Sequence, residues 1–334
     1  LTEIDALFTN IPNDTNSDPE LMFQSSSDAN QCGADSRARV TRGSGTSSCS
    51  SRSSYTGGDC SQSGSSEEDQ SECSTATEDA IVATIPKFPV QAIALERCEQ
   101  TLDSLLVHDK LSDRELSSMV GQLLMILVTL QKTFSLTHND LHTNNIMWIK
   151  TDRKFLFYKV EGIHYKIPTF GKIYKIIDFG RAIYKFKGCV VCSDSFHPKG
   201  DAATQYNCEP YVNDKKPRLD PNPSFDLCRL GCSIYDFLVD PDNTANEMKD
   251  LCEIEQIIVK WCHDDKGRNI MYKTNGQERY PEFKLYKMIA RTVHNHAPLT
   301  VLGHKHFSKY IVNKKQAYKG GAVMNIDEYP SYVD

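Results

Sequence analysis

Two short polar motifs, each placed after an apolar segment, limit most strongly what this chain can fold into. The first is HNDLHTNN at 138–145, and the second is DFG at 178–180. Together they supply a carboxylate at Asp140, a carboxamide at Asn145 and a second carboxylate at Asp178. Phosphoryl transfer from a metal-bound nucleotide uses such a set. We therefore expect these three side chains to converge on one cleft.

The residue types suggest separate roles within that cleft. Asp140 would orient an attacking hydroxyl and accept its proton. Asn145 and Asp178 offer hard oxygen ligands, which suit a Mg²⁺ ion that keeps part of its water and phosphate coordination. His138 would hold the loop by packing and hydrogen bonding, and would not act as a base.

The segments around the motifs predict the elements that carry them. Ser112-x-x-Glu115 is a capping box, and the helix that it opens has apolar residues at helical spacing as far as Phe134. Residues 101–107 predict a short helix before it, and 86–96 predict one or two strands. After the first motif we expect a strand at 146–149, an enlarged β-hairpin from 154–166 and 171–177, and then DFG. Further helices are expected at 225–239, which Ser224 would cap, 246–263 and 282–294. Residues 181–222 predict a long, irregular segment.

The order of these motifs resembles the catalytic loop and DFG motif of protein kinases. More narrowly, the chain is similar to Ser/Thr protein kinases of large DNA viruses. The resemblance covers residues 81–312 and also rests on GDAATQYN at 200–207 and PSFDLCRLGCSIYDFL at 223–238. It implies an α+β, two-lobe kinase-like fold with an incomplete small lobe and a mainly helical large lobe. It also implies ATP and Mg²⁺ as cofactors and a protein Ser or Thr hydroxyl as the phosphate acceptor.

The resemblance also implies roles for particular residues. Asp140 would be the base of a catalytic loop that contains His138 and His142. Glu96 and Cys98 would lie in the hinge that meets adenine, while Asn145 and Asp178 would hold the Mg²⁺–nucleotide. Phe179, Gly180 and Asp226 would form the scaffold, with Asp226 holding the loop backbone. An ordinary first-turn Asp, favoured by the helix dipole, is the alternative for Asp226.

Composition divides the chain into five parts. Residues 24–80 are rich in Ser, Gly, Asp and Glu and poor in large apolar residues, so they cannot bury enough surface to offset their ordering entropy. We expect a small-lobe remnant at 1–23, a disordered Ser-rich insertion at 24–80, small-lobe strands and hinge at 81–98, a large lobe at 99–315, and a tail at 316–334.

Departures from the kinase pattern leave other functions open. His142 stands where Ser/Thr kinases usually have a Lys, as in small-molecule phosphotransferases. We find no strand Lys, helix Glu or glycine-rich loop, which would suit either a fragment that begins within the small lobe at Leu1 or a catalytically dead interaction module. A scaffold whose functional part is the Ser-rich segment is a further alternative.

Charge and apolar runs exclude several partners. The net charge of −6 gives no basic field for nucleic acid. No apolar run approaches the length of a membrane span, and no secretion signal begins the chain. We expect a cytoplasmic monomer, in an infected host cell or virion if the viral resemblance holds.

The twelve Cys predict free thiols. The irregular spacing of Cys189, Cys192, His197 and Cys208 argues against zinc, and the His residues at 294–306 predict solvated or core positions.

Overall fold

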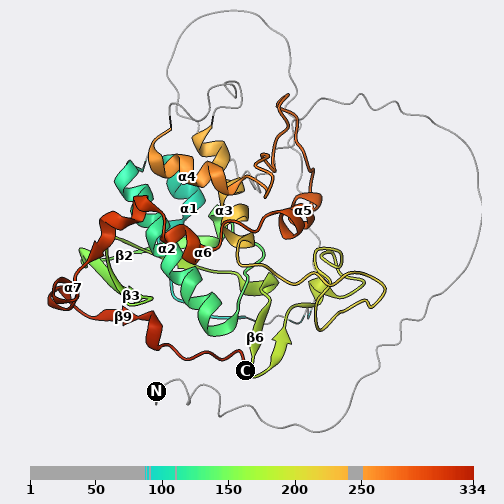
Figure 1. The fold of residues 1–334 in the computed structure, drawn as a ribbon, viewed down its shortest axis with the longest axis horizontal. Coiled ribbons are helices and arrows are strands. Elements are labelled where there is room, and N and C mark those ends of the chain that lie inside the picture. The colour runs from blue at the N-terminus through green and yellow to red at the C-terminus, as the bar shows by residue number, and fades with distance from the viewer. Residues whose placement is uncertain (1–86, 88, 90–91, 110, 240–250) are drawn as a thin grey trace, which may run out of the picture. The chain divides into compact units, whose positions relative to one another are not determined.

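The structure is a computed structural model that describes residues 87, 89, 92–109, 111–239 and 251–334. All of them belong to the unit Ser48–Asp334. The expected small-lobe remnant and Ser-rich insertion lie outside the described residues. The described part combines helices with small sheets, which confirms the α+β class (Figure 1).

The two helices expected before the first motif are present. Helix α1 spans Leu102–His108, and α2 spans Asp113–Phe134. The Ser112 side chain accepts a hydrogen bond from the Glu115 N–H, and the Glu115 carboxylate accepts one from the Ser112 N–H. This reciprocal cap fixes the start of α2, whose apolar residues at helical spacing lie in the core. The helix ends four residues before His138, as predicted.

A three-stranded antiparallel sheet connects the two motifs. Its strands are β1 (Gln100–Thr101), β2 (Ile146–Lys150) and β5 (Lys172–Ile176), in the order β1-β2-β5. Strand β2 leaves the first motif directly, and β5 leads into the second. Because Ile146 pairs with Ile176, the residues just outside the pair also meet: the Ile177 N–H donates to the Asn145 carbonyl at 3.0 Å.

The expected enlarged hairpin forms, but in a second sheet. Strands β3 (Phe155–Val160) and β4 (Ile163–Pro168) pair with each other. Strand β8 (Ile311–Val312) joins β4, and β9 (Val323–Asn325) runs parallel to β3. Helix α7 (Lys314–Gly320) connects these outer strands. The segment expected as a tail, 316–334, therefore supplies part of a sheet, because β3 has an edge that β9 can pair with.

Two local expectations are wrong. Among residues 87, 89 and 92–98 the structure has no strand, and the Ile93 and Leu95 side chains are exposed. The segment 181–222 is less irregular than expected. It contains a hairpin of β6 (Tyr184–Phe186) and β7 (Cys189–Val191), followed by a short 3₁₀ turn at Asp194–Phe196. Lys187 and Gly188 both have positive φ, which is the backbone that a tight two-residue hairpin turn requires.

Helix α3 (Phe225–Leu238) is buried along most of its length and packs on α4 (Glu253–Trp261). The expected cap at Ser224 is wrong: its hydroxyl accepts from the His296 N–H, because this end of the helix is covered by a later segment. The helix expected at 246–263 is α4, and residues 246–250 lie outside the described residues. One core gathers around α2 and the sheets, and a second lies among α3, α4 and helix α5 at Lys284–Thr292.

Three further elements complete the described chain: α5 (Lys284–Thr292), α6 (Pro298–Leu302) and a 3₁₀ helix at Lys305–Tyr310. His294, His296 and His306 each bond a different partner, so this His-rich stretch is structural. Within the described ranges, no helix is both long and apolar enough to cross a bilayer.

Candidate active site

Helix α3 holds the backbone of the first motif through the side chain of Asp226. The buried Asp226 carboxylate accepts hydrogen bonds from the His138 N–H at 2.9 Å and from the Asn139 N–H at 3.0 Å. Burial raises the pKa of Asp226, while His138 and the two N–H donors oppose that rise. The contact between Asp226 and the loop backbone is the one implied by the kinase resemblance. Asp226 is therefore not a simple first-turn residue.

His138 ties the first motif to the second. It is fully buried, and its Nε2 lies 2.9 Å from the Ile177 carbonyl, next to Asp178. The Asp140 N–H donates to His138 Nδ1 at 3.3 Å, so Nδ1 is the acceptor nitrogen of the ring and Nε2 is the one that can donate to the Ile177 carbonyl. Its ring centroid is 5.1 Å from that of Phe179. His138 thus connects and packs, as the sequence predicts, and both ring nitrogens are occupied within the fold.

Asp140 lies at the centre of the site. Its carbonyl accepts from Asn145 Nδ2 at 2.9 Å, so the amide oxygen of Asn145 is not used in this bond. Its carboxylate is partly exposed, and one oxygen, Oδ2, lies 4.0 Å from His142 Nε2. The other oxygen, Oδ1, accepts a hydrogen bond from the Tyr286 hydroxyl at 2.6 Å. The carboxylate is therefore held in one orientation with one oxygen toward His142.

Asp178 directly follows Ile177, whose carbonyl lies against His138. Its backbone is left-handed, with φ 59°, and its exposed carboxylate accepts from the Gly180 N–H at 3.3 Å. Burial, followed by the positive charge of Arg229, lowers the pKa of His142, while Asp140 and Asp178 both act in the opposite direction. Both carboxylates are thus within electrostatic range of one imidazole. The backbone bond between the Ile177 N–H and the Asn145 carbonyl also joins the residue before Asp178 to the end of the first motif.

Tyr286 and Arg229 belong to this site and are absent from the sequence-based assignment. Buried Arg229, on α3, donates from Nε to the Tyr286 hydroxyl oxygen at 2.9 Å, and that hydroxyl in turn donates to Asp140. Burial raises the pKa of Tyr286, so the hydroxyl keeps its proton. No local signal could identify this pair, because Tyr286 follows Asp140 by 146 positions and reaches it only when α5 packs beside α3.

The hinge candidates lie farther along the first sheet. Glu96 is exposed and forms an ion pair with Lys175 of β5. Cys98 is half-buried, with its sulfur 3.9 Å from the Glu96 carbonyl oxygen. The Glu99 N–H donates to the Trp148 carbonyl, which joins this extended segment to β2. These contacts bring Glu96 to the strand that precedes Asp178, but no hydrogen bond described here joins Glu96 or Cys98 to Asp140.

The donor set matches a hard cation better than zinc. In the described parts of the chain, no cluster of three or more His, Cys, Asp and Glu side chains is placed to hold a metal ion. Cys189, Cys192, His197 and Cys208 are accordingly not gathered into such a cluster. Asn145 and Asp178 instead offer an amide oxygen and a carboxylate. Two such oxygens, completed by water and phosphate, are a usual environment for Mg²⁺.

No protein-family model and no curated protein sequence matches this chain.

Proposed function

We propose that this chain is a protein Ser/Thr kinase, which transfers the γ-phosphoryl group of ATP to a protein hydroxyl. The main support is the way Asp140 is held. Asp226 fixes the backbone before it, and Asn145 bonds its carbonyl. Asp178 follows the strand that pairs with the strand leaving the loop. A base, two oxygen ligands and a rigid support are what positioning and proton transfer require.

Asp140 is the proposed base. Tyr286 binds Oδ1, which leaves Oδ2 to accept the proton of a substrate hydroxyl. Fixing the carboxylate in advance reduces the ordering needed when substrate arrives. Asn145 and Asp178 would hold Mg²⁺, which when bound neutralises charge on the phosphates. The partial exposure of the Asp140 and Asp178 side chains would leave both accessible to ligands.

A small-molecule phosphotransferase is the second candidate, and His142 favours it. The imidazole lies near Asp140, and its lowered pKa keeps it neutral at pH 7. A neutral imidazole can accept or donate one hydrogen bond to a small polar substrate, but it lacks the fixed charge of the Lys found in Ser/Thr kinases. Activity on small alcohols or sugars, with none on proteins, would favour this candidate.

The test measures transfer and nucleotide binding separately. We expect Asp140→Ala to reduce phosphate transfer from radiolabelled ATP to a protein substrate mixture by about 10³-fold, within the range for a lost general base. Its affinity for Mg²⁺–ATP, measured by titration calorimetry, should change little. Asp178→Ala should weaken that affinity as well, because it removes a proposed metal ligand.

Asp152→Ala is the matched control, since Asp152 is exposed in the loop after β2. It should leave both measurements unchanged. Equal transfer by wild type and Asp140→Ala would overturn the proposed mechanism. Binding of Mg²⁺–ATP without transfer to any hydroxyl substrate would instead identify a nucleotide-binding module that does not catalyse.

A further inference from the structure

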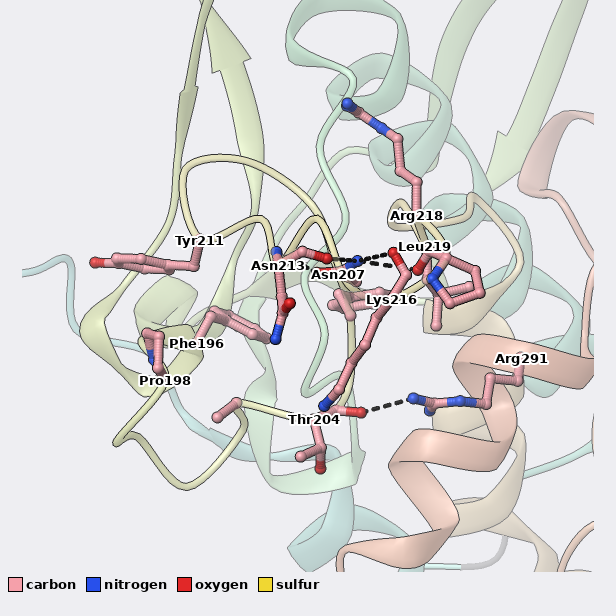
Figure 2. Close-up of a pocket in the computed structure, with 13 residues that line it drawn as sticks. Phe196, Pro198, Thr204, Asn207, Tyr211, Asn213, Lys216, Arg218, Leu219 and Arg291 are labelled. Atoms are coloured by element: carbon pink, nitrogen blue, oxygen red, sulfur yellow. Dashed lines mark hydrogen bonds between the residues drawn. The ribbon is translucent and has the colours of Figure 1, made fainter.

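A pocket of about 500 Å³ lies between the segment 196–219 and helix α5. Phe196, Pro198 and Tyr211 form one part of its lining, and Lys216 and Arg291 form another (Figure 2). The pocket is connected to the candidate active site, because the hydroxyl of its lining residue Tyr206 donates to Asn139 Oδ1 at 2.6 Å. It is nevertheless separate from the Asp140 carboxylate, which is not part of its lining.

The loop that carries Lys216 is held in shape by one buried side chain. Asn207 Nδ2 lies within 3.0–3.1 Å of the carbonyls of Asn213, Lys216 and Pro217, and Asn207 Oδ1 accepts from the Asn213 N–H. The backbone of Asn207 also pairs with that of Leu219. An amide that contacts several backbone groups fixes the loop before any ligand arrives, which reduces the entropy lost on binding.

The positive charges in this pocket differ in their partners. Arg218 forms ion pairs with Asp220 and Glu209, and in Figure 2 it points away from the other two cations. Lys216 and Arg291 pair with no carboxylate among the described residues. Arg291 donates instead to the carbonyls of Thr204, Gln205 and Lys287, and burial lowers its pKa. Figure 2 shows the Lys216 side chain extended toward Thr204, on the side where Arg291 lies.

We propose that this pocket binds a phosphate monoester carried by a Ser or Thr of another polypeptide. The two cations without a carboxylate partner carry a combined charge of about +2, which matches a phosphate monoester of about −1.5 to −2 charge at pH 7. A single Asp or Glu, with one negative charge, would neutralise only one of them. The volume also exceeds that of a phosphate group, and the Phe196, Pro198 and Tyr211 side chains offer contacts for flanking residues. This binding is independent of phosphoryl transfer and would occur even if the chain catalysed nothing.

The experiment measures the anisotropy of a fluorescein-labelled peptide, Ala-Ala-phosphoSer-Ala-Ala, mixed with the full chain. The same peptide with Ser or Glu at the centre provides the comparison, and inorganic phosphate is the competitor. We expect the phosphorylated peptide to bind at least about tenfold more tightly than either comparison peptide. Lys216→Gln should weaken its binding by about tenfold or more, as expected for loss of a charge-assisted hydrogen bond.

Lys215→Gln is the matched control. It removes the same positive charge at the neighbouring position, and the Lys215 side chain is exposed and does not line the pocket. It should retain wild-type affinity. An equal loss in both variants would mean non-specific attraction and would overturn the proposal. So would equal binding of the phosphorylated and Ser peptides. Competition by inorganic phosphate supports recognition of the phosphate group, whereas phosphate binding without binding of the phosphorylated peptide would assign the pocket to a free anion and overturn it.

Discussion

At the scale of single residues, the pKa of His142 depends on burial and on the charges around the candidate site. Burial is the largest influence on its pKa and lowers it, and Arg229 adds to this effect. The unfolded chain has an ordinary His pKa of 6.5, so as the pH falls below that value the unfolded state binds a proton that the folded state does not. This difference costs stability on the acid side and disappears above the ordinary pKa.

We therefore expect His142→Gln, which cannot titrate, to lose less stability than the wild type between pH 7 and pH 5. Urea unfolding followed by circular dichroism at both pH values measures the difference. His108→Gln is the control, since His108 is exposed at the end of α1. It should keep the pH dependence of the wild type. A steeper loss in His142→Gln than in the wild type would show that the folded protein prefers a charged His142.

At the scale of elements, the contact between α3 and α4 depends on Gly231. A Cβ there would lie 3.1 Å from Trp261 Cβ and 3.2 Å from the Ile258 carbonyl oxygen, and neither atom is at the end of a flexible side chain. Gly231→Ala should lower the free energy of unfolding by up to about 2 kcal/mol, because an overpacking cost of about 1–3 kcal/mol outweighs the gain of about 1 kcal/mol in helix propensity.

Gly121→Ala is the matched comparison within α2. The nearest atom to its added Cβ is the flexible end of Ile167, at 3.3 Å. That side chain can move, so we expect this variant to be near neutral or slightly stabilised. Urea unfolding at pH 7 measures the change in the free energy of unfolding for both variants. Equal effects of the two substitutions would mean that helix propensity, and not helix–helix contact, governs both positions.

At the scale of the whole molecule, the C-terminal segment and the Ser-rich segment should contribute very differently to stability. Strand β9 pairs with β3, Ile326 is buried, and the Tyr332 ring stacks on Phe134 at 5.3 Å. Removing 322–334 should therefore lower the melting temperature by more than about 8 °C. Replacing 26–78 with a short Gly-Ser linker should lower it by less than about 3 °C, because the composition of that segment cannot support a core and longer loops cost little extra closure entropy.

Differential scanning calorimetry of the two variants and the full chain tests this contrast. The reverse order, with the linker variant less stable than the truncated one, would show that the Ser-rich segment packs against the rest of the protein. That result would contradict the interpretation of its composition as disordered.

Local sequence determined the features that depend on near neighbours. The Ser112–Glu115 cap and the apolar spacing of 113–134 predicted α2, and runs of aromatic and β-branched residues predicted the paired strands β2 and β5 that lead from the first motif to Asp178. Resemblance to kinases added the contact between Asp226 and the loop. Tertiary structure alone decided the rest: the Tyr286 hydroxyl on Asp140, the strand that the C-terminal segment adds to β3, and the Lys216–Arg291 pocket. Caps and periodicity act within a few residues, whereas these contacts join distant segments and exist only once the helices and sheets have packed.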